Sequence, residues 1–240
     1  MRKILLCATM LVSISSGTFL TAEDKQNIST KDVLQLQVRT HYIQGHNYAE
    51  YGMYENAIAE FKKVLEAAPN FVDVRFELGL AYASTGKLDD AIHEYQKVLE
   101  INPNHPRVHY ELALAYYDKD MTDEGIALCQ ARLKDHPDKG NMHSILGVLY
   151  IKKGHIDEAI SEFKKQIEFN QHPEMGYVNL GMALAKKGTL DEAIQAFKKS
   201  TELNSRNPRA HYQLGIVYEK KGMKEEAERE MALYRELMSR

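Results

Sequence analysis

Residues 72–105 read VDVRFELGLAYASTGKLDDAIHEYQKVLEINPNH, and this stretch of 34 residues decides the fold. In its first half, Leu78, Gly79 and Tyr82 fall on one side of a helix, because residues three and four apart share a helical face. The small Gly79 lets that helix press closely against a neighbour. Gly86 follows where the helix must end, and glycine readily takes the left-handed conformation that ends many helices. The first half therefore predicts one short amphipathic helix.

The second half of the stretch predicts a second helix. Asp89 stands in its first turn, where a negative charge suits the helix dipole. Ala91, Tyr95 and Leu99 then form an apolar stripe at a spacing of four residues. Pro103 stops the helix from continuing. The 34 residues thus predict a helix–turn–helix unit.

The same pattern recurs six times from residue 38 to the end of the chain, with no insertion between copies. The frames are 38–71, 72–105, 106–139, 140–173, 174–207 and 208–240. A column of small residues is formed by Gly45, Gly79, Ala113, Gly147, Gly181 and Gly215. Sixteen positions later stand Phe61, Tyr95, Cys129, Phe163, Phe197 and Met231. One such unit cannot bury its apolar face alone, so we expect successive units to stack.

These columns resemble those of the tetratricopeptide repeat (TPR) family. The motifs that carry the resemblance are Leu78-Gly79-x-x-Tyr82, Ala57-x-x-x-Phe61 and Pro69. The resemblance covers residues 38–240 and implies an all-α fold, a right-handed α-solenoid of six tandem repeats. The third repeat departs most, with Ala113 and Cys129 in the two columns, and we expect it to pack more loosely. His109 and His143 stand where the family packs an aromatic residue, so we expect packed or half-buried histidines there.

Composition and motifs exclude several classes of function. The chain has 44% hydrophobic and 27% charged residues, which is enough apolar surface for a core. A net charge of −3 argues against a nucleic-acid partner. There is no nucleophile elbow, phosphate-binding glycine loop or HExxH motif, so we expect no enzyme activity and no cofactor. The histidines lack recurring acidic or cysteine neighbours, so we expect no metal site.

The first 22 residues differ from the rest. Arg2 and Lys3 precede an apolar run from Ile4 to Ile14, and small residues follow, as in a secretory signal peptide cut after residue 22 or after residue 17. Residues 23–37 are then a linker and the start of the first helix. We expect an exported protein, periplasmic or extracellular. An uncleaved anchor facing the periplasm and a chance apolar start are the alternatives.

The resemblance implies that the first helix of each repeat lines a concave groove that binds a protein or peptide. Several positions on that face are apolar or aromatic here, and Tyr and Arg are frequent binding anchors. The same side chains could instead pack between neighbouring helices. The predicted groove residues are Arg39, Tyr42, Phe76, Leu80, Arg107, Tyr110, Leu114, Tyr117, Val148, Met182, Tyr212 and Ile216.

Lysine pairs form a second feature, each placed just before the glycine that ends a first helix. Cations favour helix C-termini, so the pairs can be ordinary solvated residues. They could also orient an acidic partner, because residues 140–240 carry a slight basic excess and residues 23–139 an acidic one. This predicted basic rim consists of Lys152, Lys153, Lys186, Lys187, Lys220 and Lys221.

Together these features predict a non-enzymatic scaffold of the cell envelope, similar to bacterial repeat proteins that assist the assembly of envelope machines. Its guest would be an apolar segment or helix of a partner protein. The alternative is a self-assembling array or homo-oligomer. In the last repeat, Glu228 and Arg235 replace apolar columns, which is the polar outer face that the end of an array needs.

Overall fold

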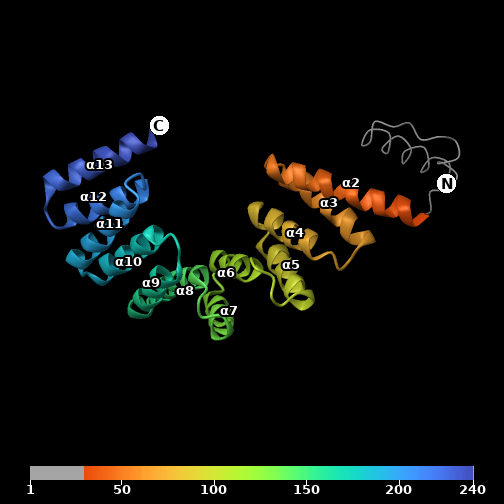
Figure 1. The fold of residues 1–240 in the computed structure, drawn as a ribbon, viewed down its shortest axis with the longest axis horizontal. Helices are drawn as coiled ribbons and strands as arrows, with labels where there is room; N and C mark the ends of the chain where they lie inside the picture. The colour runs from red at the N-terminus through yellow and green to blue at the C-terminus, as the bar shows by residue number, and fades with distance from the viewer. Residues whose placement is uncertain (1–29, 240) are drawn as a thin grey trace. The chain divides into compact units, whose positions relative to one another are not determined.

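The computed structural model describes residues 30–239, which form twelve helices and no strand (Figure 1). The predicted signal peptide, residues 1–22, lies outside the described residues. None of the twelve helices is both long and apolar enough to cross a membrane. The helices are α2 (Thr30–Glu50), α3 (Tyr54–Ala67), α4 (Val72–Ser84), α5 (Leu88–Ile101), α6 (Val108–Asp118), α7 (Thr122–Asp135), α8 (Gly140–Lys153), α9 (Ile156–Phe169), α10 (Glu174–Lys187), α11 (Leu190–Leu203), α12 (Pro208–Lys220) and α13 (Lys224–Met238).

The predicted all-α solenoid is confirmed, since the helices form six consecutive pairs. The chain divides into two compact units, one ending at Val108 and the other beginning at His109. In the first unit α2 packs on α3, α3 on α4 and α4 on α5, and the first helices α2 and α4 also touch. In the second unit α7 to α13 pack in the same order, and the first helices α8, α10 and α12 touch their neighbours. Each unit therefore has a face made of first helices.

In most repeats, the small residue of the first helix packs against a large side chain of the second helix. A Cβ added to Gly147 would lie 2.5 Å from the Phe163 ring, and one added to Gly79 would lie 2.5 Å from Tyr95. No side chain tolerates such a distance, so only glycine lets these two helices approach so closely. In the third repeat the column holds Ala113, and its counterpart is the small Cys129. Both are fully buried, so the exchange is compensated and the expected looser packing is not seen at this column.

The glycines that end the first helices adopt positive φ, as predicted; Gly86, for example, has a φ of +74°. In the third repeat Asp120 takes this place, with a φ of +62°. A non-glycine residue pays a steric cost in the left-handed region, although Asp tolerates it better than most. The Asp120 carboxylate also pairs with Lys152 at 2.5 Å.

Histidine replaces the family's packed aromatic residue by pairing with the second helix of its own repeat. His143 Nδ1 lies 2.6 Å from a Glu162 carboxylate oxygen, and its Nε2 lies 2.8 Å from the carbonyl oxygen of Pro137. His211 repeats the arrangement with Glu230, also at 2.6 Å. The packed histidine predicted at His143 is confirmed, since its side chain is buried.

Candidate functional site

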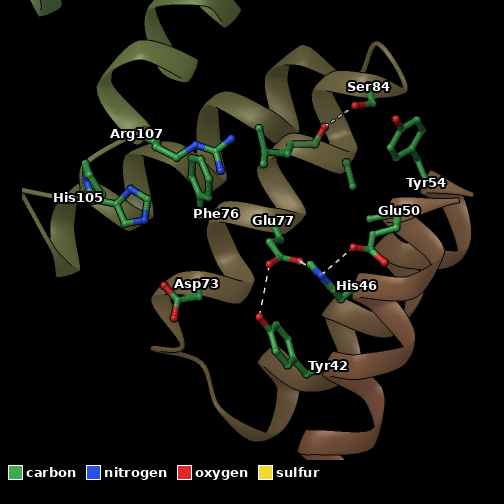
Figure 2. Close-up of a pocket in the computed structure, with 14 residues that line it drawn as sticks. Tyr42, His46, Glu50, Tyr54, Asp73, Phe76, Glu77, Ser84, His105 and Arg107 are labelled. Atoms are coloured by element: carbon green, nitrogen blue, oxygen red, sulfur yellow. Dashed lines mark hydrogen bonds and ion pairs between the residues drawn. The ribbon is translucent and has the colours of Figure 1, made fainter. Parts of the chain in front are cut away.

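The first-helix face of the first unit carries a hollow of about 590 Å³, which we call the first-unit hollow (Figure 2). Helices α2 and α4 supply most of its walls, and the segment before α6 closes one end. Its size is typical of pockets that hold a small guest or a few side chains of a partner. Its lining residues are Tyr42, His46, Ala49, Glu50, Tyr54, Asp73, Phe76, Glu77, Leu80, Ala81, Ser84, His105, Pro106 and Arg107.

One side of the first-unit hollow is acidic. His46 Nδ1 lies 3.1 Å from Glu77 and its Nε2 lies 3.5 Å from Glu50, as Figure 2 shows. The hydrogen bond with Glu77 raises the pKa of His46, and only a protonated ring can donate to both carboxylates. The Tyr42 hydroxyl lies 3.4 Å from Glu77. Burial, and then the Glu77 charge, raises the pKa of Tyr42. Asp73 adds a third carboxylate, so the acidic groups outnumber what His46 can neutralise.

The opposite end of the first-unit hollow is built around Phe76. The ring of His105 lies 4.6 Å from the Phe76 ring, and the Arg107 guanidinium lies 5.0 Å from the same ring. Phe76 is only 5% exposed, so it supports the wall and leaves little surface for a guest. His105 is also buried, and burial lowers the pKa of its ring. Its Nδ1 has no hydrogen-bond partner within residues 30–239. Leu80 is only partly buried, so it presents more apolar surface to a guest than Phe76 does.

The first-helix face of the second unit carries another hollow, of about 460 Å³, which we call the second-unit hollow. Helices α8 and α10 supply most of its lining, with one residue each from α6, α9 and α12. Three of its residues are cationic and none is acidic. The lining residues are Tyr117, Val148, Ile151, Lys152, Phe163, Asn179, Met182, Ala183, Lys186 and Arg209.

The structure divides the predicted groove residues among several places. Four line the first-unit hollow: Tyr42, Phe76, Leu80 and Arg107. Three line the second-unit hollow: Tyr117, Val148 and Met182.

The remaining five lie outside both hollows. Arg39 lines a smaller hollow of about 380 Å³ beside α2. Tyr110 and Leu114 are partly buried and pack against the core around Cys129. Tyr212 is 40% exposed and its ring lies 5.1 Å from that of Tyr234. Ile216 is partly buried on the same helix.

The predicted basic rim separates into two kinds of lysine. The second lysine of each pair reaches back to the previous repeat, to an aspartate in the first turn of its second helix. These ion pairs are Lys153 with Asp123, Lys187 with Asp157 and Lys221 with Asp191. The first lysines behave differently, because Lys152 and Lys186 line the second-unit hollow. Lys220 is exposed and lies outside both hollows. A binding role for the rim stays a prediction.

Sequence reasoning did not assign Glu50, Tyr54, His105 or Asn179 to a site. A signal existed only for Asn179, which shares a helical stripe with Met182 and Lys186 at spacings of three and seven residues. The other three belong to helix ends and a linker, and repeat columns do not say which way such residues turn.

Reactive chemistry finds little support among the described residues. No group of three or more His, Cys, Asp or Glu side chains in residues 30–239 is arranged to hold a metal ion. Cys129 is fully buried, and burial raises the pKa of its thiol to about 12. The thiol therefore stays protonated at neutral pH.

Two family profiles match the sequence. The profile described as TPR repeat matches residues 45–86, 79–120 and 181–222, and the profile described as Tetratricopeptide repeat matches residues 141–173. No curated protein matches the sequence.

Solved structures share the fold. MamA protein is 28% identical, with a TM-score of 0.61, and the match covers 71% of this chain and 93% of that one. Pseudomonas aeruginosa pilF is 17% identical, with a TM-score of 0.67 and coverage of 86% and 98%. YrrB, described as a TPR protein with an unusual peptide-binding site, is 24% identical, with a TM-score of 0.53 and coverage of 74% and 91%. The likeness to pilF and YrrB concerns the fold alone. Because the two profiles match more than half of the sequence and the helices pair as the repeat requires, the chain belongs to the tetratricopeptide repeat family.

Proposed function

We propose that the chain is a non-enzymatic scaffold of the cell envelope that holds an apolar segment or helix of a partner protein in its first-unit hollow. Tetratricopeptide repeat proteins are protein-interaction scaffolds and are generally not enzymes. Beyond this general role, the proposal specifies the binding surface (the first-unit hollow), the guest (an apolar segment or helix) and the location (the cell envelope).

The observation that carries the proposal is the composition of the first-unit hollow. Ala49 on α2 and Leu80 on α4, both partly buried, give it an apolar base, and α2 and α4 touch directly. Small side chains here leave room that a guest's larger side chains can fill. Burying apolar surface contributes about 25 cal/mol per Å², so even a few side chains of a guest would contribute several kcal/mol.

The acidic side of the first-unit hollow narrows the kind of guest. A guest that presents a carboxylate, such as the C-terminus of a protein, would be repelled by Glu77. A guest with an apolar side chain over Leu80 and a neutral or positive group beside Glu50 and Glu77 fits the charges better. Either an extended peptide or an amphipathic helix could meet these conditions.

The envelope part of the proposal rests on residues 1–22. Their basic start, apolar run and small residues have the order of a signal peptide. Export would leave Cys129 as the only cysteine, so no disulfide would form within the mature chain, and packing of the repeats must then supply the stability.

Replacing Ala49 by Arg tests the hollow directly. The longer side chain would fill the space that the guest needs, and Arg is a good helix former, so α2 should persist. The matched control is Ala59→Arg, an exposed alanine on α3 that receives the same charge and lies outside the hollow. Full-length protein carrying each change would be used to capture partners from envelope extract, with circular dichroism to confirm the helical content.

We expect the wild type and Ala59→Arg to retain a common partner that Ala49→Arg loses. A partner held equally by all three proteins would contradict the assignment of the hollow as the binding surface. If no partner is retained by the wild type, the scaffold proposal itself is contradicted.

A further inference from the structure

The second-unit hollow combines an apolar base with unopposed positive charge. We propose that it binds a second guest, an internal segment of a partner protein that carries an acidic side chain beside apolar ones. This site goes beyond the function proposed above, because it lies in the other unit and takes a guest of the opposite charge.

Two of its cations have no carboxylate partner among residues 30–239. Lys186 Nζ makes one contact, 3.4 Å from the carbonyl oxygen of Ile151. The Arg209 guanidinium contacts the sulfur of Met182 at 3.3 Å, which is a weak acceptor. The neighbouring Lys187 differs, since it pairs with Asp157 at 2.7 Å. The two lysines therefore differ in role. Lys187 forms an ion pair between two repeats, whereas Lys186 remains available to a guest at the hollow.

The third cation is already partly neutralised. Lys152 pairs with Asp120 at 2.5 Å and lies 4.3 Å from the centroid of the Tyr117 ring. It also donates to the carbonyl oxygen of Tyr117. Lys152 and Tyr117 therefore form one wall of the hollow, and the attraction for a guest's carboxylate comes mainly from Lys186 and Arg209.

The base of the second-unit hollow is apolar and adaptable. Val148, Ile151 and Met182 are partly buried side chains that pack against the core of the unit. The flexible thioether of Met182 can adjust to guests of different shape. An acidic group alone would gain little from exposed cations, because surface ion pairs contribute about 0–1 kcal/mol. The apolar base is what makes a mixed segment, apolar with an acidic residue, the best match.

The two hollows therefore discriminate by charge. The first-unit hollow is lined by the carboxylates of Glu50, Asp73 and Glu77, which outnumber the cations Arg107 and His46 and so oppose an acidic guest. The second-unit hollow has no acidic lining residue. Unfavourable pairing of like charges costs more than favourable surface pairing gains, so the first-unit hollow should reject an acidic guest and the second-unit hollow should reject a guest that carries a positive group.

A displayed peptide library tests the proposal without knowledge of the natural partner. Random twelve-residue peptides joined to their carrier through their C-terminal ends have no free terminal carboxylate, so any acidic preference must come from side chains. The full chain would select from this library as wild type, as Lys186→Glu/Arg209→Glu and as Lys224→Glu/Arg206→Glu. The last pair is the matched control, an exposed Lys and Arg of the same unit that lie outside the hollow and outside the predicted basic rim.

We expect the wild type and the control to enrich peptides with Asp or Glu next to apolar residues. A selected peptide should bind the Lys186→Glu/Arg209→Glu variant at least tenfold more weakly, and binding to the wild type should weaken in 0.5 M salt. Ala49→Arg should leave this binding unchanged, which separates the outcome from a failure of the first-unit hollow. Circular dichroism would confirm that each variant keeps its helices, and the single variant Arg209→Gln replaces the double one if it does not.

Three results would overturn the proposal. The first is no enrichment of acidic residues by the wild type. The second is equal loss of binding in the control pair. The third is binding to vesicles of anionic lipid that the hollow variant loses while no peptide is selected, which would assign the charge to a membrane surface instead.

Discussion

Phe163 should be among the costliest side chains to truncate, because its repeat has been shaped around it. The ring is 2% exposed on α9 and sits against Gly147 on α8, where even a Cβ would lie 2.5 Å from it. Phe163→Ala removes the ring, and the two helices cannot close the void without shifting their neighbours. Truncation of a buried Phe costs about 3–5 kcal/mol, which is a large share of the roughly 5–15 kcal/mol that stabilises a typical domain.

Two other truncations calibrate the measurement. Phe169→Ala removes the same side chain from the same helix at a position that is 41% exposed, so it should cost about 1 kcal/mol or less. Met231→Ala removes a side chain of α13 that is only partly buried, so it should cost about 2 kcal/mol or less.

Urea denaturation of the full chain, followed by circular dichroism, measures all three changes. Because a repeat array can unfold in stages, the midpoint of the transition that responds to each change is the quantity to compare. If Phe163→Ala and Met231→Ala lower that midpoint equally, the difference in burial between these two side chains does not set the cost of truncation. If Phe169→Ala matches Phe163→Ala, burial is not what decides the cost.

Two further predictions concern pH and export. Burial opposes the charge of Glu162, but hydrogen bonds from His143 and Lys165 outweigh it and lower the pKa of this carboxyl below 4.5. A lowered pKa stabilises the fold above about pH 4.5, and this contribution disappears as the pH falls through the lowered value. Glu162→Gln should therefore cost about 1–3 kcal/mol at pH 7 and less at pH 3, and a constant difference in urea midpoint would contradict this reasoning. For export, mass spectrometry of the native protein should find an N-terminus between Thr18 and Glu23, and an intact Met1 in a cytosolic fraction would refute it.

The repeat columns were sufficient to predict the fold from the sequence alone. Pairs of positions 16 residues apart, such as Gly79 and Tyr95, recur because the small residue must leave room for the large one. This pairing of sizes can be recognised in the sequence. The glycine column at the helix ends was readable for the same reason, since the positive φ of Gly86 leaves few alternatives. In the third repeat the larger Ala113 replaces glycine and the smaller Cys129 replaces the large side chain. Both are fully buried, so the smaller cysteine compensates for the larger alanine, which the sequence alone did not establish.

The lining of the candidate site was harder to predict, because a repeat position indicates the helix face on which a side chain lies but not how deeply that side chain is buried. Phe76 and Leu80 share the first-helix face of α4, yet Phe76 is covered by the ring of His105 and the guanidinium of Arg107. Those two residues come from a linker whose path no periodicity describes. Likewise, Lys186 and Lys187 are identical neighbours in sequence, and only their contacts separate a cation at a hollow from one tied to Asp157.

The ion pairs between repeats have a consequence for how such a chain can change its length. Lys187 meets Asp157 and Lys221 meets Asp191, so each bond spans 30 residues and lies within the period of 34. His143 and Glu162, 19 residues apart, lie inside a single repeat. Duplication of residues 174–207, a step of 34 codons, would recreate the lysine–aspartate contact at the new junction, because that repeat carries both Lys187 and Asp191. The polar contacts of the array are thus inherited with the repeat itself, and selection can adjust the number of repeats without redesigning the joints between them.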